Sequence, residues 1–568
     1  MTDALLDSLC ESVDGAVLMR HIGALSQWVK LSGSQGEAES LRFIRAQLDG
    51  YGFRTRMLSH DAYISLPGRS LVQVDGRTLD SITHSFSCAS PAGGVTGELV
   101  HVGAGNDTDF AGRDLRGCIV LVDGIATPPV ARRASLAGAA GQLHISPHEH
   151  LHEMCISPVW GNPSDETLAE LPTTVVCSVL LSAGAALRDR LARGEPPTVM
   201  LQAEVDTGWR KTPILVAEMD APGADGDSPF VLFSGHHDTW YYGVMDNGGA
   251  NATMLEVARL CGAQRDKWRR GLWLCFWSGH SHGRYSGSTW YVDEHWDELD
   301  RHCVAHINVD STGAEGADIL GNVGSMSELR ALATEAIRDQ AEQALAGKRM
   351  SRGADQSFNG VGLPAIFGDL SEPVPTPVGA HCWWWHTPDD LADKISEKNL
   401  VRDTRIYVHA VWRLLNDPVL PLDYGAYAQD LLEELGKLRK ALGQRLSLDS
   451  LEAGAAALRD NAAQLVTRAA AANDDSVVRI NRALMRMSRA LVPVDYTSGD
   501  RFAHDPALAQ PAWSTLQPLR NLAAADPGSD AARFLTVGAI RARNRVVHAL
   551  RQANQAAETV FGSSAQQR

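Results

Sequence analysis

The chain has 568 residues, which is too long for one hydrophobic core and predicts about two to four domains. Hydrophobic residues make up 44% of the sequence and charged residues 21%, as in ordinary globular proteins. The 68 acidic residues outnumber the 52 basic residues, the formal net charge is −16, and no block of lysines and arginines stands out. Because a nucleic-acid-binding protein needs a basic face to neutralise phosphates, we expect no nucleic-acid partner.

The sequence also carries no signal for a membrane or for export. No apolar run approaches the roughly 20 residues that a membrane span requires, so we expect no membrane partner. Residues 1–17 contain acidic residues and lack the basic segment and apolar stretch of a signal peptide. The nine cysteines are scattered, without a Cys-x-x-Cys spacing, as in proteins with reduced thiols. We therefore expect a cytoplasmic protein.

The N-terminal third predicts helices followed by strands. Residues 17–48 have the pattern of two helices with a break at Ser32-Gly33-Ser34, and residues 53–58 have that of a strand. From residue 86 to residue 205, short β-like runs alternate with glycine and proline turns around one alanine-rich helix at 131–140. We interpret this stretch as an inserted, β-rich module.

The middle of the chain predicts an α/β fold, with a sheet covered by helices. Short apolar runs alternate there with helical segments such as residues 249–260. The runs are residues 214–219, 230–234, 272–277 and 304–309. Strands that are apolar throughout are buried on both faces, which is typical of α/β folds.

The C-terminal part predicts a helical bundle. From residue 424 the chain is rich in alanine, leucine, arginine and glutamate, with helical periodicity. One apolar stripe consists of Leu431, Leu432, Leu435, Leu438 and Leu442. The expected division of the chain is residues 1–85 and 208–422 for the α/β domain, 86–207 for the inserted module and 423–568 for the bundle.

Four segments of the α/β part carry residues suited to a metal. They are Ser234–Thr239, Gly243–Ala250, His306–Gly313 and Trp383–Leu391. In three of them a histidine or an aspartate stands at or just past the end of a predicted strand, the edge where open α/β sheets place their sites. Imidazole nitrogens and carboxylate oxygens are natural ligands for Zn²⁺ or a similar divalent ion. Together the segments predict a divalent metal site at this edge.

The order of the motifs resembles a known family, the co-catalytic zinc aminopeptidases. The matching motifs are His236-x-Asp238, Asp246-Asn-Gly-Gly-Ala, Gly287-Ser288, Asn308-x-Asp310 and His386-Thr387. The chain looks closest to the branch that contains glutamate carboxypeptidase and the transferrin receptor. Residues 107–145 look like the protease-associated (apical) domain of that branch, and residues 481–516 look like its helical dimerisation domain. The resemblance implies a zinc-exopeptidase-like mixed sheet and a homodimer formed through the C-terminal helices.

By this resemblance each motif has a role at a metal site. His236 and Asp310 would hold a first ion. Asp246 would bridge it to a second ion, which His386 would ligate. Asp238 would lie behind His236 and orient its imidazole. The implied cofactor is one or two Zn²⁺ ions, with Mn²⁺ or another divalent ion as a substitute.

The sequence departs from the family at the catalytic carboxylates. After the strand that ends at Trp277 the family carries two adjacent glutamates, of which the first is the general base and the second ligates a metal. Here those positions hold His280 and Ser281, followed by His282, and no carboxylate remains. Three explanations stay open: one histidine replaces the lost ligand, one acts as general base beside a single ion, or the site is inactive, as in the receptor.

Residues near these motifs are candidates for contact with a substrate. Arg284 and Tyr285 are candidates to meet a substrate or an oxyanion, although Arg284 is equally expected in a structural ion pair. Trp385, in the aromatic run 383–385, belongs either to a pocket wall or to the core.

A second metal-binding motif occurs in the inserted module. His148-Glu149-His150-Leu151-His152 matches the His-Glu-x-x-His signature of zincins, which functions only on a helix. Here it follows Pro147 and a β-like run, which disfavours the zincin interpretation. In the two alternatives, His152 and its neighbours line the pocket beneath the apical domain, or they form a solvated loop.

These observations predict a metal-dependent hydrolase that cleaves a peptide or amide bond in a peptide or a small molecule. The metal would lower the pKa of the attacking water and polarise the carbonyl. His280 or His282 would supply the missing ligand or base. The alternative is a non-catalytic binding protein on a peptidase scaffold, which should purify without stoichiometric metal.

Overall fold

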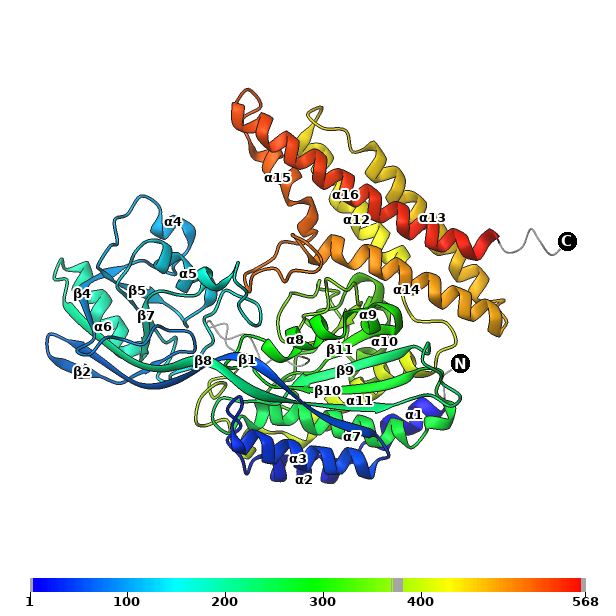
Figure 1. The fold of residues 1–568 in the computed structure, drawn as a ribbon, viewed down its shortest axis with the longest axis horizontal. Coiled ribbons are helices and arrows are strands. Elements are labelled where there is room, and N and C mark those ends of the chain that lie inside the picture. Colours follow the sequence, from blue (N-terminus) through cyan, green and yellow to red (C-terminus); the bar gives the residue numbers. More distant parts are fainter. Residues whose placement is uncertain (1–3, 369, 371–381, 563–568) are drawn as a thin grey trace.

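The computed structural model describes residues 4–368, 370 and 382–562. Figure 1 shows a central α/β domain, a lobe beside it at the left, and a helical bundle above the central domain. We call the lobe, residues 70–203, the apical lobe. One sheet of 12 strands runs through the central domain and the apical lobe. The mixed sheet with its helices, together with the helical C-terminal region, confirms the expected fold class.

The central domain is built on parallel strands that are buried on both faces. In sheet order its strands are β12 (Ala365–Ile366), β11 (Cys303–Asn308), β9 (Phe230–His236), β10 (Gly271–Trp277), β8 (Thr198–Met219) and β1 (Arg54–Val74). The first four run parallel, and β8 runs antiparallel to β10. Every residue of β9, β10 and β11 is buried, which explains why these segments are apolar with little alternation.

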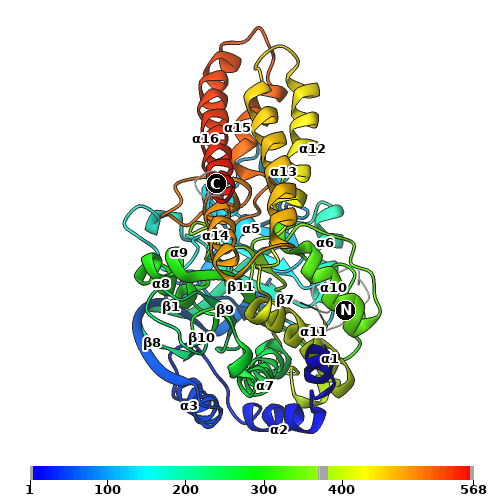
Figure 2. The same ribbon diagram turned by 90° about the vertical axis from the view of Figure 1, so that its right-hand side faces the viewer.

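Helices cover both faces of this sheet (Figure 2). One face packs against α1 (Ala4–Glu11), α2 (Gly15–Leu25), α3 (Gln35–Gly50), α7 (Ala250–Gly262), α10 (Arg330–Ala341) and α11 (Glu397–Asn416). The other face packs against α8 (Ser286–Glu294) and α9 (Trp296–His302). Successive side chains of a strand point to opposite faces, so Val231 and Phe233 enter the first core while Phe230 and Leu232 enter the second.

Two long strands connect the central domain to the apical lobe. β1 has 21 residues and β8 has 22, and they pair antiparallel from Arg54 opposite Glu218 to Val74 opposite Val199. The sequence patterns predict only the inner ends of this ribbon as strand, at 53–58 and 214–219. The outer halves mix buried with exposed residues, so no continuous apolar run marks them. The expected boundary at 207/208 therefore lies inside β8.

The apical lobe carries the expected strands and adds helices to them. Its strands are β2 (Arg77–Leu79), β3 (Ser81–Thr83), β4 (Val95–His101), β5 (Ile119–Asp123), β6 (Gly141–Ile145) and β7 (Val175–Val179). Strands β4 to β7 run parallel and are linked through α4 (Asp107–Phe110), α5 (Pro128–Leu136) and other crossovers, with α6 (Leu181–Ala192) after β7. The helix expected at 131–140 ends at Leu136, because Gly138 takes a positive φ of 73° and reverses the chain.

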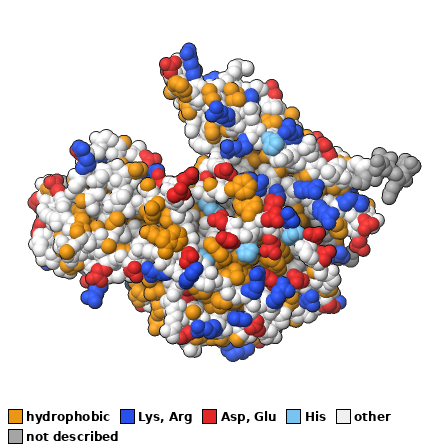
Figure 3. All heavy atoms as spheres, in the orientation of Figure 1, with side chains coloured by type: hydrophobic (Ala, Val, Ile, Leu, Met, Phe, Trp, Pro, Cys, Tyr) orange, Lys and Arg blue, Asp and Glu red, His pale blue; other side chains and the backbone are white. Residues whose placement is uncertain are grey.

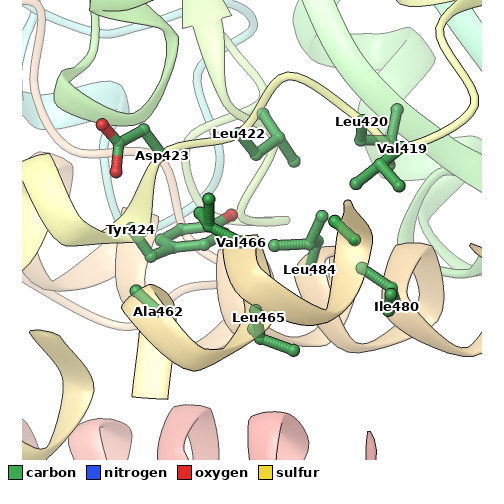
Figure 4. A pocket seen from close by; sticks show the side chains of 11 residues that line it. Val419, Leu420, Leu422, Asp423, Tyr424, Ala462, Leu465, Val466, Ile480 and Leu484 are labelled. Atoms are coloured by element: carbon green, nitrogen blue, oxygen red, sulfur yellow. The ribbon is translucent and has the colours of Figure 1, made fainter. Parts of the chain in front are cut away.

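The C-terminal chain forms the expected helical bundle. Its helices are α12 (Tyr424–Leu442), α13 (Asp449–Ala469), α14 (Asp474–Tyr496), α15 (Gln517–Ala524) and α16 (Asp530–Phe561). Of the predicted leucine stripe on α12, Leu432 is half-buried and the other four leucines are buried. An apolar cavity of about 120 Å³ lies where α12, α13 and α14 meet the linker at 419–423 (Figure 4). Its lining holds one carboxylate, Asp423, and no histidine, so it offers no metal site.

The bundle is fixed to the central domain through α14. The buried guanidinium of Arg489 donates hydrogen bonds to the carbonyls of Leu299, Asp300, Cys303 and Gly362. Acidic and basic side chains are interspersed over the face of the molecule drawn in Figure 3. Within the described part of the chain, no helix combines the length and the apolar character needed to cross a membrane.

Candidate metal centre and active-site cavity

Four predicted metal ligands meet at the carboxyl edge of the central sheet. His236 is the last residue of β9, and Asp310 follows the end of β11 by two residues. Asp246 lies in the turn before α7, and His386 lies in the loop that precedes α11. Parallel strands end at the same edge, so residues far apart in the sequence converge there.

The four side chains form one connected cluster around Asp246. His236 Nε2 is 2.9 Å from Asp246 Oδ1 and 3.4 Å from Asp310 Oδ1. His386 Nε2 is 3.0 Å from the other oxygen of the same carboxylate, Asp246 Oδ2. Asp246 thus lies between the two histidines, as expected for a residue that bridges two positions.

Main-chain carbonyls fix the orientation of both histidines. His236 Nδ1 lies 2.8 Å from the carbonyl oxygen of Asp238, and His386 Nδ1 lies 2.7 Å from that of Glu153. A carbonyl can only accept, so each Nδ1 carries the proton and each neutral ring presents the lone pair of Nε2 to carboxylate oxygens. Lone pairs that face one another require a cation between them, and a divalent metal fits this set of donors.

The pKa of His236 reflects the same requirement. Burial alone would lower this pKa, but the carboxylates of Asp310 and Asp246 outweigh burial and raise it well above the ordinary histidine value. In the metal-free protein a proton on His236 therefore compensates the negative charge that an ion would otherwise neutralise.

A network of buried side chains ties the ligand-bearing loops together. Both carboxylate oxygens of Asp390 accept main-chain hydrogen bonds, from Met245 N at 2.8 Å and from Asp246 N at 3.1 Å. The side chain of Asn247 donates to the carbonyls of His236 and Val309. These contacts hold the turn of Asp246 against the ends of β9 and β11.

Asp238 has a different task from the one predicted. The group that orients the imidazole of His236 is the main-chain carbonyl of Asp238, whereas its carboxylate points to the loop after β10. That carboxylate accepts hydrogen bonds from His280 N at 3.1 Å, Ser281 N at 2.9 Å and Ser32 Oγ at 2.6 Å. Asp238 therefore shapes the loop that replaces the family's two glutamates.

His280 faces the metal ligands and is paired with a carboxylate. Its Nδ1 is 2.8 Å from Asp355 Oδ2, and Asp355 Oδ1 accepts a hydrogen bond from Ser288 Oγ at 2.7 Å. Ligand atoms of His236, His280 and Asp310 lie within 4.8 Å of one another, which by distance alone permits a shared ion. The aspartate partner leaves Nε2 of His280 as the nitrogen available for other contacts.

The stacking of His280 on His236 argues against a shared ion. The two rings are 3.7 Å apart at their centroids and inclined by only 13°. An imidazole binds a metal through a lone pair in the plane of its ring. Nearly parallel planes at this separation do not meet within bonding distance, so one ion cannot lie in both planes while the rings keep this arrangement.

His282 points away from the metal ligands. It is buried, its Nδ1 is 2.9 Å from Ser32 Oγ, and its ring packs against Trp240 with centroids 4.3 Å apart. Burial lowers its pKa, so it is held as a neutral histidine. Of the two predicted candidates for the missing base or ligand, only His280 therefore reaches the cluster.

A cavity of about 250 Å³ opens beside the cluster. Its lining residues come from the metal centre, the loop after β10, the apical lobe and the loops at 353–354 and 385–386. They are Met154, Cys155, Trp240, Asp246, His280, Ser281, Arg284, Tyr285, Asp310, Ser311, Gly353, Ala354, Trp385 and His386. Three of the four predicted substrate contacts, Arg284, Tyr285 and Trp385, belong to this lining.

The fourth predicted contact, His152, lies outside the cavity wall. It is buried, its Nδ1 bonds the carbonyl of Trp385, and its Nε2 is 3.0 Å from His148 Nε2. His152 thus supports the loop that carries Trp385 and His386.

The zincin interpretation of the His-Glu-x-x-His motif is wrong. Residues 148–152 are not helical, so the two histidines do not project from one helix face. Glu149 accepts hydrogen bonds from Ser182 N at 2.7 Å and Ser182 Oγ at 2.9 Å at the start of α6. The glutamate that a zincin needs for catalysis therefore serves as a helix cap here.

The aromatic run 383–385 divides between three environments. Trp383 is 41% exposed, Trp384 is buried, and Trp385 lines the cavity while its ring stacks on His386 at 3.6 Å. Both interpretations of the run hold for different residues, since one tryptophan enters the core and one forms the pocket wall.

Two functional contacts were not predicted from the sequence. Asp355, the partner of His280, lies in a loop without regular structure, and no metal-binding or catalytic motif marks it in the sequence. The contact of Glu153 with His386 uses a main-chain carbonyl, which any residue supplies and no motif can mark.

Comparison with known proteins agrees with this geometry. Residues 215–411 match the family model of peptidase family M28. The chain is 24% identical over 519 residues to the probable glutamate carboxypeptidase VP8 of Zea mays, covering 74% of this chain and 70% of that protein. It is also 25% identical over 266 residues to the probable lipoprotein aminopeptidase LpqL of Mycobacterium tuberculosis, covering 45% of this chain and 48% of that protein.

Two solved structures support the same fold. A peptidase M28 precursor from Shewanella amazonensis superposes with a TM-score of 0.59 and 18% identity, over 73% of this chain and 97% of that one. An aminopeptidase from Aneurinibacillus superposes with a TM-score of 0.55 and 22% identity, over 72% of this chain and 95% of that one. At these identities the likeness concerns the fold alone.

All four converging ligands lie within the matched residues 215–411. The match supports metal-dependent hydrolysis of a peptide bond and does not favour the alternative of a non-catalytic binding protein. Residues 215–411 match peptidase family M28, and the chain is similar to co-catalytic zinc aminopeptidases and to glutamate carboxypeptidase-like proteins.

Proposed function

We propose that this chain hydrolyses an amide bond with one tightly bound divalent ion and with His280 as the general base. The observation that carries this proposal is the contact of His280 Nδ1 with Asp355 Oδ2 at 2.8 Å, directly beside the proposed ligands. It gives the loop that lost both glutamates an imidazole whose Nε2 can act as a general base.

His236, Asp246 and Asp310 would hold the ion, because Nε2 of His236 lies 2.9 Å from Asp246 Oδ1 and 3.4 Å from Asp310 Oδ1. A zinc or similar ion bound there would supply Lewis acidity, which lowers the pKa of water and polarises a carbonyl. The hydrogen bond from His236 Nδ1 to the carbonyl of Asp238 keeps Nε2 directed at the ligands.

His280 would take the proton from the attacking water at Nε2 and return it to the leaving nitrogen. Asp355 fixes the tautomer with the proton on Nδ1 and stabilises the imidazolium that forms, as the aspartate does in serine-protease triads. Ser288 in turn donates to Asp355 and holds its carboxylate in place. The cavity position of His280 gives it access to a substrate, since its side chain is 14% exposed.

The second metal position of the family would be weak here. His386 Nε2 and Asp246 Oδ2 lie 3.0 Å apart, but no third histidine, cysteine or carboxylate joins them among the residues that the structure describes. A structural zinc site normally has four protein ligands and a catalytic site has three. We therefore propose a single stoichiometric ion, zinc in preference to manganese, with His386 shaping the cavity.

Activity with and without metal tests this proposal. Full-length protein loaded with zinc should release the amine from short peptides or N-acyl amino acids, should lose that activity with a chelator, and should regain it when zinc is restored. His280→Ala should abolish turnover, while His548→Ala, on the exposed surface of α16, should have wild-type turnover. A zinc-loaded protein that hydrolyses no amide in a broad panel would favour the non-catalytic binding protein instead.

Two further proposals rest on the resemblance: the apical lobe would correspond to a protease-associated domain, and the bundle would form a homodimer. A third, that the protein acts in the cytoplasm, rests on its scattered cysteines. Light scattering coupled to size-exclusion chromatography tests the dimer, because a mass near that of one chain in dilute solution would contradict it.

A further inference from the structure

Arg284 presents a cation without a partner in the wall of the active-site cavity. Its guanidinium forms no ion pair and no hydrogen bond with any residue that the structure describes, and its Nε is buried without an acceptor. Its guanidinium carbon lies 5.0 Å from the centre of the Tyr285 ring. The sequence left open whether Arg284 forms a structural ion pair, and it forms none with the described residues.

Two other arginines, buried Arg270 and half-buried Arg349, show the usual arrangement. Arg270 donates to the carbonyls of Leu414, Asp417 and Pro418, and Arg349 bonds both carboxylate oxygens of Asp495. Buried polar groups are normally hydrogen-bonded, because a buried polar or charged group without a partner is destabilising. An arginine that departs from this pattern inside a catalytic cavity indicates that its partner is the ligand.

The backbone holds Arg284 in this place. Arg284 and Tyr285 both have positive φ values, 48° and 72°, a left-handed conformation that bulky residues rarely adopt. The carbonyl of Arg284 accepts a hydrogen bond from Gly161 N, and the ring of Tyr285 packs on Trp160 with centroids 4.3 Å apart. The apical lobe therefore fixes the turn that aims this side chain.

The proposed metal site uses both carboxylates of the described cavity wall but not the guanidinium of Arg284. The lining contains two carboxylates, Asp246 and Asp310, and both belong to the proposed metal site. Among the described residues, no other acid lines the cavity to receive the ammonium group of a free N-terminus. Arg284 is the one arginine or lysine of this described lining, and a guanidinium matches a carboxylate with two parallel hydrogen bonds.

We propose that Arg284 binds the free carboxylate of the substrate, so that the enzyme cleaves amino acids acylated on nitrogen, including the last residue of a short peptide. This inference rests on the proposed function and names its substrate class. In the reaction water adds its oxygen to the acyl carbon, the C–N bond breaks, and the amino acid leaves with the proton from water on its nitrogen. A cavity of about 250 Å³ suits a ligand of this small size.

The test compares an acid with its neutral analogue. Zinc-loaded full-length protein is given a panel of N-acetyl amino acids and the matching primary amides, and acetate release is measured for each. We expect kcat/KM for the acids to exceed that for the amides by about 100-fold, since the half-buried guanidinium of Arg284 pairs with the acid and is left without a partner by the neutral amide. In Arg284→Leu this ratio should fall to about one, mainly through KM, and Arg284→Lys should restore part of it.

A control and a binding measurement complete the test. Arg301→Leu removes an exposed arginine on α9 and should keep the wild-type ratio. The thermal stabilisation by N-acetyl-L-phenylalanine and by its amide is measured on zinc-loaded wild type and Arg284→Leu, at unchanged zinc content. The acid should stabilise the wild type more, and the variant should lose that difference.

Each outcome separates the two proposals. Equal hydrolysis of acids and amides by the wild type would overturn the role of Arg284 and leave the hydrolase function standing. Absence of any hydrolysis would contradict the proposed function, and the stabilisation measurement would still decide whether Arg284 binds a carboxylate. Stabilisation by inorganic phosphate but not by the N-acetyl amino acid would also overturn the inference.

Discussion

The ring of His280 lies parallel to the ring of His236, with their centroids 3.7 Å apart and their planes inclined by 13°. This arrangement places a histidine against the first metal ligand while it keeps the two lone pairs from converging on one ion. Together with Asp355 behind it, His280 is arranged as a base and not as a ligand. The predictions below follow from this assignment and from the packing around it.

The two histidine ligands should differ in their effect on metal content. His236→Ala removes a ligand that lies near both Asp246 and Asp310, so the variant should lose stoichiometric zinc. His386→Ala removes a ligand that meets only Asp246 Oδ2, so it should keep one zinc and lose activity about tenfold or more through the cavity wall. Elemental analysis and turnover of both variants check this, and a variant His386→Ala without zinc would contradict it.

Asp355 should act through His280 and not on the substrate. Asp355→Asn removes the acceptor that fixes the proton on Nδ1, so kcat should fall about 100-fold or more while KM and zinc content stay near wild type. Asp355→Glu should recover part of kcat. Asp297→Asn, an exposed residue on α9, is the matched control. A change confined to KM would show that Asp355 binds substrate instead.

His282 should be a structural residue. Its ring is buried against Trp240 and bonded to Ser32, so His282→Ala should cost about 1–3 kcal/mol of stability and lower the Tm. Turnover should fall less than about tenfold, because His282 does not line the cavity. The opposite profile, an unchanged Tm with turnover abolished, would transfer the catalytic role from His280 to His282.

A buried glutamate between the central domain and the bundle should make stability depend on pH. Burial raises the pKa of Glu328 to about 7, and the nearby carboxylates of Asp495 and Asp430 add to the shift. The folded state therefore holds a proton that the unfolded state has lost above its ordinary pKa, so stability falls as pH rises from about 4.5 to 7. The cost above pH 7 is about 3 kcal/mol.

Glu328→Gln removes this titration and serves as the test. The Tm of the variant relative to wild type should rise between pH 5 and pH 8, as measured by thermal unfolding in matched buffers. Glu433→Gln, an exposed substitution on α12, should show no such trend. A constant difference across this range would mean that Glu328 is ionised in the folded protein throughout.

The sequence predicts the sheet best where the strands are apolar throughout. β9, β10 and β11 are buried on both faces, and the apolar runs mark them closely. The outer halves of β1 and β8 were not predicted, because each satisfies its backbone by pairing with the other and mixes buried with exposed side chains. Pairing between distant segments leaves no local pattern in either one.

The metal ligands were predictable because motif order and strand ends both point to them. The geometry of the altered loop was not, since His280 and His282 are two residues apart and equally good candidates by chemistry. Hydrogen bonds from His280 N and Ser281 N to the carboxylate of Asp238 decide which ring faces the cavity. Such contacts depend on the folded loop and not on residue type.

Zinc content and turnover, measured side by side on wild type and His280→Ala, test the central claim most directly. The proteins are purified without chelating resin, saturated with zinc and freed of loosely bound ions before elemental analysis. We predict one equivalent of zinc per chain in both proteins, with turnover lost only in the variant. Two equivalents in the wild type that fall to one in His280→Ala would show that His280 is a metal ligand and would contradict its role as the base.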